Sequence, residues 1–283
     1  MVFLPEGALS LGMATPSSAP RSGAGGLLRH WRTIRHLSQL DLALSAGISS
    51  RHLSYVETGR SRPSREMVLR LSEALEVPLR ERNALLVAAG FAPRYYETGL
   101  AAPELAQMRQ AVELILQHQE PYPAIVMDRH WEVQLANQAA PRFTTFLLGA
   151  PSTESNIMRM CLHPDGLRAV TLNWEEVAED LLRHLHGQVV ALPSDERARA
   201  LLDEVLGYPG VAEVWERRAT DVPATPLLTS IFRKGDIELR YFSTFTTFGT
   251  PHDVTLEEMR IECSFPADPF TATVSRQLFG ATV

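Results

Sequence analysis

The spacing of hydrophobic residues changes along the chain, from helical spacing in the first third to alternation in the last. Between residues 38 and 57 two short helical patterns meet at Gly47, a residue that readily takes the positive φ that ends a helix. Ser38 can cap the first pattern, with Asp41 as its capping-box partner. The predicted inward residues are Leu40, Ala43 and Leu44 in the first pattern and Leu53 and Val56 in the second. This arrangement predicts a helix-turn-helix.

The polar residues of the second helix define a face that can meet a DNA duplex. The residues predicted to face outward, where the major groove would lie, are Ser50, Arg51, Ser54 and Tyr55. Arg51 is the best candidate for a bidentate contact to guanine. The candidates for DNA phosphate contacts are Gln39, Ser49, Arg60, Ser61 and Arg62. The alternative is packing within the domain for Tyr55 and a solvated surface for Arg60 and Arg62.

At these residues the chain resembles the Xre/lambda-repressor class of DNA-binding domains. The resemblance is carried by Gln39, one position after the cap, by residues 57–60 (Glu-Thr-Gly-Arg) and by the Arg-Pro pair at 62–63. It implies five helices over residues 25–92, and it assigns Glu57 to holding the loop that follows the second helix. A plain all-α bundle is the alternative.

Charge divides the chain into two parts. The formal net charge is −6, yet residues 21–96 hold 12 arginines and six acidic residues, whereas residues 97–283 hold 15 basic and 26 acidic ones. A basic module is what phosphate neutralisation requires, and an acidic remainder would repel DNA. The two parts are therefore expected to have different partners.

The remainder of the chain predicts a mixed helical and β domain. A connector with a linker helix is expected over 93–119, and a strand, a turn and a second strand over 124–137. Helices follow, then a hairpin with its turn at 234–236 and an alternating strand over 256–265. Two strands, helices and three further strands are the order of a PAS-like sheet, which wraps a cavity between its concave face and its helices. The expected fold class is α+β: a five-helix lambda-repressor-like domain, then a PAS-like sensor with an antiparallel sheet over 120–283.

Four phrases, at residues 161–167, 173–178, 208–211 and 247–256, resemble the ligand-binding domain of MmyB-like transcription regulators. The resemblance implies a PAS-like sensor with a lipid-sized pocket and a fatty acid as the class of ligand. The apolar residues expected nearest the cavity are Phe143, Phe146, Met158, Trp174, Val177, Leu181, Phe242 and Phe245. For each of them, core packing without ligand contact is the alternative.

Several other classes of protein are disfavoured by the sequence. His184 and His186 stand two apart on a predicted helix and point to different faces, so they are not expected to hold one metal ion. There is no HExxH, phosphate loop or GxSxG motif, and the two cysteines form no CxxC pair. No apolar run reaches the length of a membrane span, and residues 1–24 lack the pattern of a signal peptide and predict a disordered leader.

These observations together predict a bacterial cytoplasmic transcription regulator without a cofactor or enzymatic activity. It is expected to bind double-stranded DNA as a homodimer on an inverted repeat and to respond to a small hydrophobic ligand. The alternative is a regulator whose C-terminal domain is a ligand-independent protein-interaction or dimerisation module.

Overall fold

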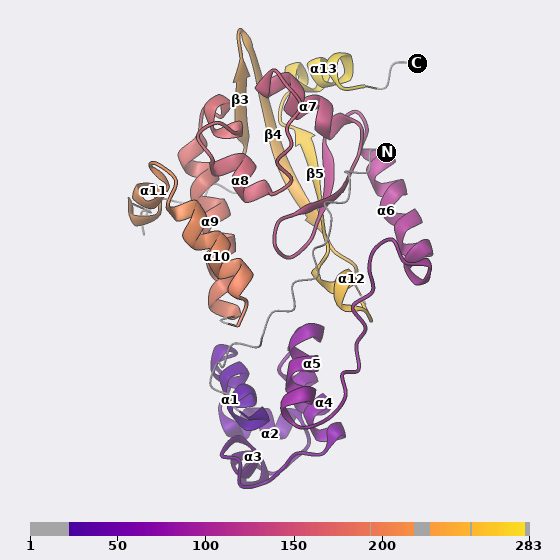
Figure 1. The fold of residues 1–283 in the computed structure, drawn as a ribbon, viewed down its shortest axis with the longest axis vertical. Helices are drawn as coiled ribbons and strands as arrows, with labels where there is room; N and C mark the ends of the chain where they lie inside the picture. Colours follow the sequence, from indigo (N-terminus) through magenta and orange to yellow (C-terminus); the bar gives the residue numbers. More distant parts are fainter. Residues whose placement is uncertain (1–22, 193, 218–226, 250, 281–283) are drawn as a thin grey trace. The chain divides into compact units, whose positions relative to one another are not determined.

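The computed structural model describes residues 23–192, 194–217, 227–249 and 251–280 (Figure 1). These residues form two compact units. The first unit holds residues 23–100 together with 248–257, and the second holds residues 101–247 together with 258–280. The predicted leader lies outside the described residues except for its last two positions.

The first unit is built from five helices, as the sequence predicts. They are α1 (Ala24–Ile34), α2 (Gln39–Ser45), α3 (Ser50–Glu57), α4 (Arg65–Ala74) and α5 (Leu79–Ala88). Ser38 and Asp41 form both bonds of the capping box, and Gly47 has a φ of 65°. Leu53 and Val56 are buried as predicted. The helix-turn-helix is therefore α2, the glycine corner and α3.

The predicted inward face of α2 is wrong for two of its three residues. Leu40 is 58% exposed and Leu44 is 71% exposed, whereas Leu42 and Ala43 are buried. The helix contacts both α3 and α4, and these two neighbours turn the stripe of residues 42, 43 and 46 inward. Leu40 and Leu44 lie outside that stripe and face solvent.

The first unit also contains a segment that the sequence assigns to the second domain. Residues 248–257, here called the connecting segment, run between two strands of the second unit and hold most of α12 (Val254–Glu258). Asp253 accepts the N–H of Thr98 at 3.2 Å, and Tyr96 accepts the N–H of Val254 at 2.8 Å. The carboxylate of Glu257 accepts the N–H of Leu79, at the start of α5, at 2.6 Å. The predicted strand over 256–265 is therefore wrong in its first residues, which are helical.

The second unit contains the predicted five-stranded sheet. Its strands are β1 (Ala124–Met127), β2 (Val133–Ala136), β3 (Ser230–Lys234), β4 (Ile237–Thr246) and β5 (Arg260–Pro266). The strand order is β2-β1-β5-β4-β3, and every neighbouring pair is antiparallel. Along the chain, two strands, helices and three further strands follow one another as the sequence predicts, and the α+β fold class is confirmed.

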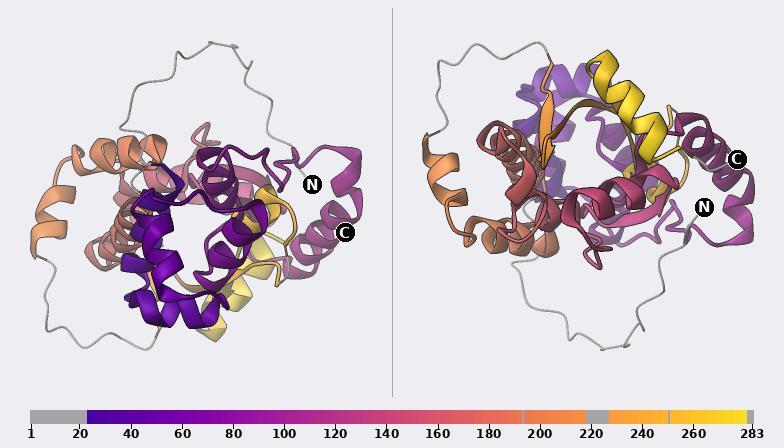
Figure 2. Two further views of the ribbon diagram at one scale, coloured as in Figure 1. Left: turned by 90° about the horizontal axis from the view of Figure 1, so that it is seen from below. Right: turned by 90° about the horizontal axis from the view of Figure 1, so that it is seen from above.

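Helices cover both faces of this sheet. Helix α6 (Ala106–Gln119), which follows η1 (Pro103–Leu105), packs on β1, and α13 (Pro269–Leu278) packs on β4 and β5 (Figure 2). The remaining helical elements are α7 (Ala139–Leu148), α8 (Ile157–Leu162), η2 (Leu167–Val170), α9 (Trp174–Ala191), α10 (Glu196–Leu206) and α11 (Val211–Arg217). Helix α9 continues through Gly187 to Ala191. Within the described residues, no helix is both long enough and apolar enough to cross a membrane.

A candidate DNA-reading surface and a candidate ligand cavity

The four predicted base-reading residues lie on α3 in two pairs spaced four apart, Ser50 with Ser54 and Arg51 with Tyr55. Ser50 and Arg51 are exposed, and Ser54 and Tyr55 are half-buried. Arg51 Nε donates to Tyr55 Oη at 3.1 Å, and the guanidinium lies 5.6 Å from the centre of the tyrosine ring. Tyr55 therefore holds the arginine in place on the exposed face of α3.

Three of the predicted phosphate-binding residues follow α3 in a tight loop. Gly59 has a φ of 73°, and the N–H groups of Arg60 and Ser61 both donate to the carbonyl of Tyr55, at 2.8 and 3.1 Å. The side chains of Arg60 and Arg62 are exposed. This loop brings two arginines next to the end of the helix that carries Arg51.

The other two predicted phosphate-binding residues have partners within the protein. The hydroxyl of Ser49 caps α3 by accepting the N–H of His52 at 3.2 Å. The amide nitrogen of Gln39 donates to Glu57 Oε2 at 2.7 Å. Both residues lie at the helix-turn-helix, and both already hold parts of it together.

Glu57 is the polar centre of the first unit. Its side chain is 1% exposed, and its carboxylate accepts two hydrogen bonds from Arg32 of α1, at 2.7 and 2.9 Å. Burial raises the pKa of Glu57, but the hydrogen bonds from Arg32 and Gln39 outweigh burial and keep this pKa below its usual value. Glu57 thus joins α3 to α1 and α2, whereas the family resemblance assigns it to the loop after α3. Helix α1 can approach α3 closely at Gly25 because glycine has no Cβ; a Cβ there would lie 2.2 Å from the carbonyl oxygen of Val56.

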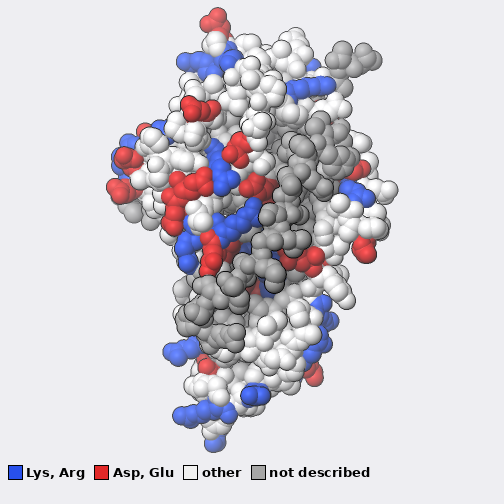
Figure 3. All heavy atoms as spheres, in the orientation of Figure 1, with Lys and Arg blue, Asp and Glu red and all other residues white. Residues whose placement is uncertain are grey.

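The second unit shows a different surface. On the face in Figure 3, acidic and basic side chains are interleaved, and many of them are paired. Arg159 contacts Glu204 at 2.7 Å, and Arg129 contacts Glu258 at 2.9 Å. Among the described residues of this face, such compensated charge leaves no continuous basic surface for DNA phosphates. The exposed arginines beside α3 are therefore the better DNA-binding candidates.

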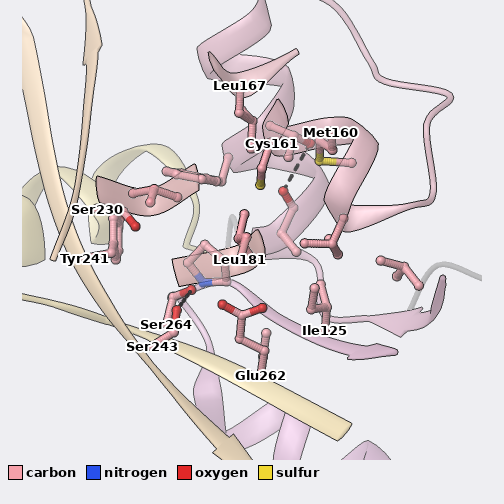
Figure 4. Close-up of a pocket in the computed structure, with 18 of the residues that line it drawn as sticks. Ile125, Met160, Cys161, Leu167, Leu181, Ser230, Tyr241, Ser243, Glu262 and Ser264 are labelled. Carbon is pink, nitrogen blue, oxygen red and sulfur yellow. Dashed lines mark hydrogen bonds between the residues drawn. The ribbon is translucent and has the colours of Figure 1, made fainter. Parts of the chain in front are cut away.

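The second unit contains a partly open cavity of about 330 Å³ between the sheet and helices α7, α8 and α9 (Figure 4). Apolar side chains from β1, α8 and α9 form much of its wall, among them Ile125, Met160 and Leu181. Pockets that hold small molecules typically measure about 300–1,000 Å³ and are mostly apolar with a few polar groups. The cavity matches this description and lies where the strand order predicts one.

Four of the eight predicted pocket residues line this cavity: Phe143, Val177, Leu181 and Phe245. The other four lie elsewhere. Met158 is fully buried in the helical core, and Phe146 packs against Phe279 with ring centres 5.8 Å apart. The indole N–H of Trp174 donates to the carbonyl of Cys161 at 3.1 Å, and Arg168 covers its ring.

Phe242 is the clearest case, because strand alternation explains its position. Tyr241, Ser243 and Phe245 of β4 line the cavity, so Phe242 lies on the opposite face, where it stacks on Phe265. Sequence reasoning chose aromatic residues of this strand without fixing which face each occupies.

The polar residues of the cavity were missed from the sequence, among them Ser243, Glu262 and Ser264 (Figure 4). The signal was present in the alternation of β5, where Glu262 and Ser264 share one face and Ile261 and Cys263 the other. An apolar face of a strand is normally read as facing the core. Here Glu262 and Ser264 line the cavity, and Ile261 and Cys263 are buried on the opposite face of the strand.

Metal-binding candidates are absent from the part of the chain that the structure describes, because no group of three or more His, Cys, Asp and Glu residues could hold an ion. His184 pairs with Asp180 on the same helix, with Nδ1 and Oδ2 3.5 Å apart. This pairing raises the pKa of His184. His186 instead lies against the ring of Trp215.

A helix-turn-helix unit and a PAS-like unit with a cavity define a transcription regulator that has separate DNA-binding and ligand-binding domains. A helix-turn-helix family model matches residues 28–82, and the model of the MmyB-like transcription regulator ligand binding domain matches residues 108–278. The second match spans more than half of the chain. The chain belongs to the MmyB-like transcription regulators.

Curated relatives of the chain are found among mycobacterial proteins. The chain is 38% identical over 69 residues to the uncharacterized HTH-type transcriptional regulators Mb0023 of Mycobacterium bovis and Rv0023 of Mycobacterium tuberculosis. Each match covers 24% of this chain and 27% of the relative, so the chain spans about a quarter of the length of these curated relatives.

Two solved structures are similar to a short part of the chain. The restriction-modification controller protein C.AhdI from Aeromonas hydrophila is 36% identical, with 21% of this chain and 89% of that chain covered and a TM-score of 0.20. The clp gene regulator ClgR from C. glutamicum is 26% identical, with 26% of this chain and 92% of that chain covered and a TM-score of 0.22.

Proposed function

We propose that this regulator binds a specific operator as a homodimer and that a small hydrophobic ligand in the cavity changes its affinity for DNA. The observation that carries the proposal is the mostly apolar cavity of about 330 Å³ in a chain that also carries an exposed Arg51 on α3. The family resemblance suggests amphiphiles of fatty-acid type as the ligand class. Each unit has its own partner: DNA for the first unit and the ligand for the second.

In the proposed complex α3 enters the major groove with its N-terminal end foremost. Arg51, held by Tyr55, makes a bidentate contact to guanine, and Ser50 and Ser54 touch neighbouring base edges. The residues proposed to hold the phosphate backbone are Gln39, Ser49, Arg60, Ser61 and Arg62. Two copies a helical turn apart on an inverted repeat multiply the specificity of one short helix.

The connecting segment offers a covalent route from the cavity to the DNA-binding unit. Strands β4 and β5 contribute Ser243, Phe245 and Glu262 to the cavity wall, and residues 248–257 join these strands. The same residues are bonded to the first unit through Asp253 and Glu257. A ligand that changes the spacing of β4 and β5 would therefore act on the N-terminus of α5. It is an effector only if it binds the DNA-competent and DNA-free states with different affinities.

The proposal is tested with the full chain, a selected operator and a series of straight-chain amphiphiles. A ligand that binds only the folded state adds about 2.7 kcal/mol of stability at a hundredfold excess over its Kd. Each buried methylene contributes about 0.8 kcal/mol, so the melting temperature should rise with chain length until the cavity is full. Operator affinity, measured by fluorescence anisotropy, should change with the same series.

Two tryptophan variants on α9 separate cavity binding from surface binding. Val177 lines the cavity, whereas Val190 is 57% exposed outside it. Val177→Trp should abolish both effects of the amphiphile, and Val190→Trp should leave them intact. If no amphiphile shifts the melting temperature and none is detected by native mass spectrometry of the purified protein, the interaction-module alternative takes its place.

A further inference from the structure

Glu262 places a carboxyl group inside the cavity (Figure 4). It lies in the middle of β5, a strand with β1 on one side and β4 on the other, and it is registered with Ile125 and Phe245. Ser243 and Ser264 line the cavity with it, and their hydroxyl oxygens are 3.5 Å apart. The carboxyl group and two hydroxyls therefore form a polar site in an otherwise largely apolar wall.

Among the described residues of the cavity wall, no basic side chain faces this carboxyl group. Of the described residues that line the cavity, Glu154, Asp180 and Glu262 are acidic and none is Lys, Arg or His. Asp180 is hydrogen-bonded to the side chain of His184, and this hydrogen bond holds the pKa of Asp180 below its usual value. Arg260, two positions before Glu262 and on the same face of β5, is not part of the cavity wall, and its guanidinium lies 5.2 Å from the centre of the Trp131 ring.

The surroundings of Glu262 oppose its negative charge. Burial raises the pKa of Glu262, and the hydrogen bond with Ser243 only partly offsets burial. The other titratable groups on the cavity wall are Cys161 of α8 and Tyr241 of β4, and their pKa values are also raised by burial. An anionic ligand head next to Glu262 would add a like charge where water screens it weakly. A hydrogen-bond donor there would instead satisfy the carboxyl group through a charge-assisted bond.

We propose that Glu262 selects the head group of the ligand and that the ligand is an apolar molecule carrying a hydrogen-bond donor, an amine or a hydroxyl, rather than an anionic carboxylate. This inference rests on the proposed function, because it assumes that the cavity is the ligand site. It narrows the ligand class by the chemistry of one side chain. Ser243 and Ser264 provide further hydrogen-bond partners for the same head group.

The test compares three ligands that share one apolar chain and differ only in the head group: decylamine, decanol and decanoate. Binding to the full chain is measured by isothermal titration calorimetry at neutral pH, below the critical micelle concentrations. Decylamine should bind tightest, decanol next and decanoate weakest, with about tenfold or more between the first and the last, which corresponds to about 1.4 kcal/mol. Val177→Trp should abolish the binding of all three, which excludes adsorption of the cationic amine to the acidic surface.

Glu262→Gln should weaken decylamine by about tenfold, because the cationic head then has no carboxylate to pair with, and should strengthen decanoate, because its head no longer meets a group that can ionise. Glu262→Asp keeps the charge and should keep the order of the three ligands. Glu175→Gln is the matched control, since Glu175 lies on α9 outside the cavity with its side chain 63% exposed. Thermal melts of each variant confirm that it is folded.

Decanoate binding as tightly as decylamine, or an order of affinities that Glu262→Gln leaves unchanged, would overturn the inference and leave the cavity as the ligand site. A failure of all three ligands to bind would count against the proposed function itself.

Discussion

Replacing Glu57 by glutamine is expected to destabilise the first unit where α1, α2 and α3 meet. The carboxylate accepts three hydrogen bonds of 2.7–2.9 Å from Arg32 and Gln39, and its side chain is 1% exposed. Glutamine offers a single acceptor oxygen and turns an NH₂ group toward donors. The guanidinium of Arg32, only 14% exposed, then loses its counter-charge.

The size of the effect follows from this burial. Removing one partner of a buried ion pair costs about 3–5 kcal/mol. Arg32 retains its bond to the carbonyl of Leu37 and some contact with water, so we expect a loss of about 2–3 kcal/mol. For a unit of this size, about 4–8 °C of melting temperature is lost per kcal/mol, which gives a decrease of about 10–20 °C.

Acid should remove the difference between the variant and the natural protein. The folded-state pKa of Glu57 is lowered, so its contribution to stability is present above the unfolded-state pKa. That contribution is lost as the pH falls through the folded-state pKa. The two melting temperatures should therefore converge at low pH.

Circular dichroism melts of the full chain measure these effects, since the first unit is all helical apart from its connections. Glu66→Gln is the matched control on α4. The side chain of Glu66 is 81% exposed and its ion pair with Arg70 is long, at 4.0 Å, so its loss should change stability little. A decrease of less than about 3 °C for Glu57→Gln, or an equal decrease for both variants, would refute the reasoning.

Four further predictions concern DNA, coupling, pH and assembly. Arg51→Ala should weaken operator binding by about 1–3 kcal/mol and relax the preference at one base position, whereas Arg62→Ala should weaken binding to operator and random DNA alike. Fluorescence anisotropy on both DNAs measures these losses. Equal losses on the two DNAs for Arg51→Ala would show that Arg51 contacts only a phosphate. Glu257→Gln should preserve ligand binding but abolish the ligand's effect on operator affinity, and an undiminished effect would contradict the coupling through the connecting segment. The pKa of Glu262 is raised, so the folded state holds the proton of Glu262 more tightly than the unfolded state does. The free energy of unfolding should therefore fall as the pH rises from the unfolded-state pKa to the folded-state pKa. Glu262→Gln should remove this pH dependence in melts at a series of pH values. Sedimentation should show a dimer at micromolar concentration and footprinting a protected site with dyad symmetry, and a monomer on an asymmetric site would exclude the dimer.

Much of the fold was predictable because its signals are local. The capping box at Ser38, the corner at Gly47 and the buried Leu53 and Val56 all depend on residues within a few positions of one another. Strand alternation and the order of elements were enough for the sheet of the second unit. Helix α2 shows the limit of this reasoning, because its seven residues do not fix which face its neighbours cover.

The connecting segment and the polar part of the cavity had no comparable signal. The hydrogen bond from the Leu79 N–H to the Glu257 carboxylate joins residues 178 positions apart, and no local sequence pattern predicts such a contact. Glu262 was visible as a polar residue in an alternating strand, but only the packing of helices on both faces of the sheet turns it toward a cavity. Its position is decided by tertiary structure and not by the strand pattern.

The connecting segment also determines when the DNA-binding unit can be completed. Residues 23–100 are synthesised early. The partner of the Leu79 N–H is Glu257, which is synthesised only after most of the ligand-binding unit. The same arrangement limits domain exchange. A hybrid made by joining a foreign sensor after residue 100 would lack residues 248–257 and leave the first turn of α5 without its carboxylate. Such a hybrid needs this short segment transplanted into the corresponding loop of the new sensor.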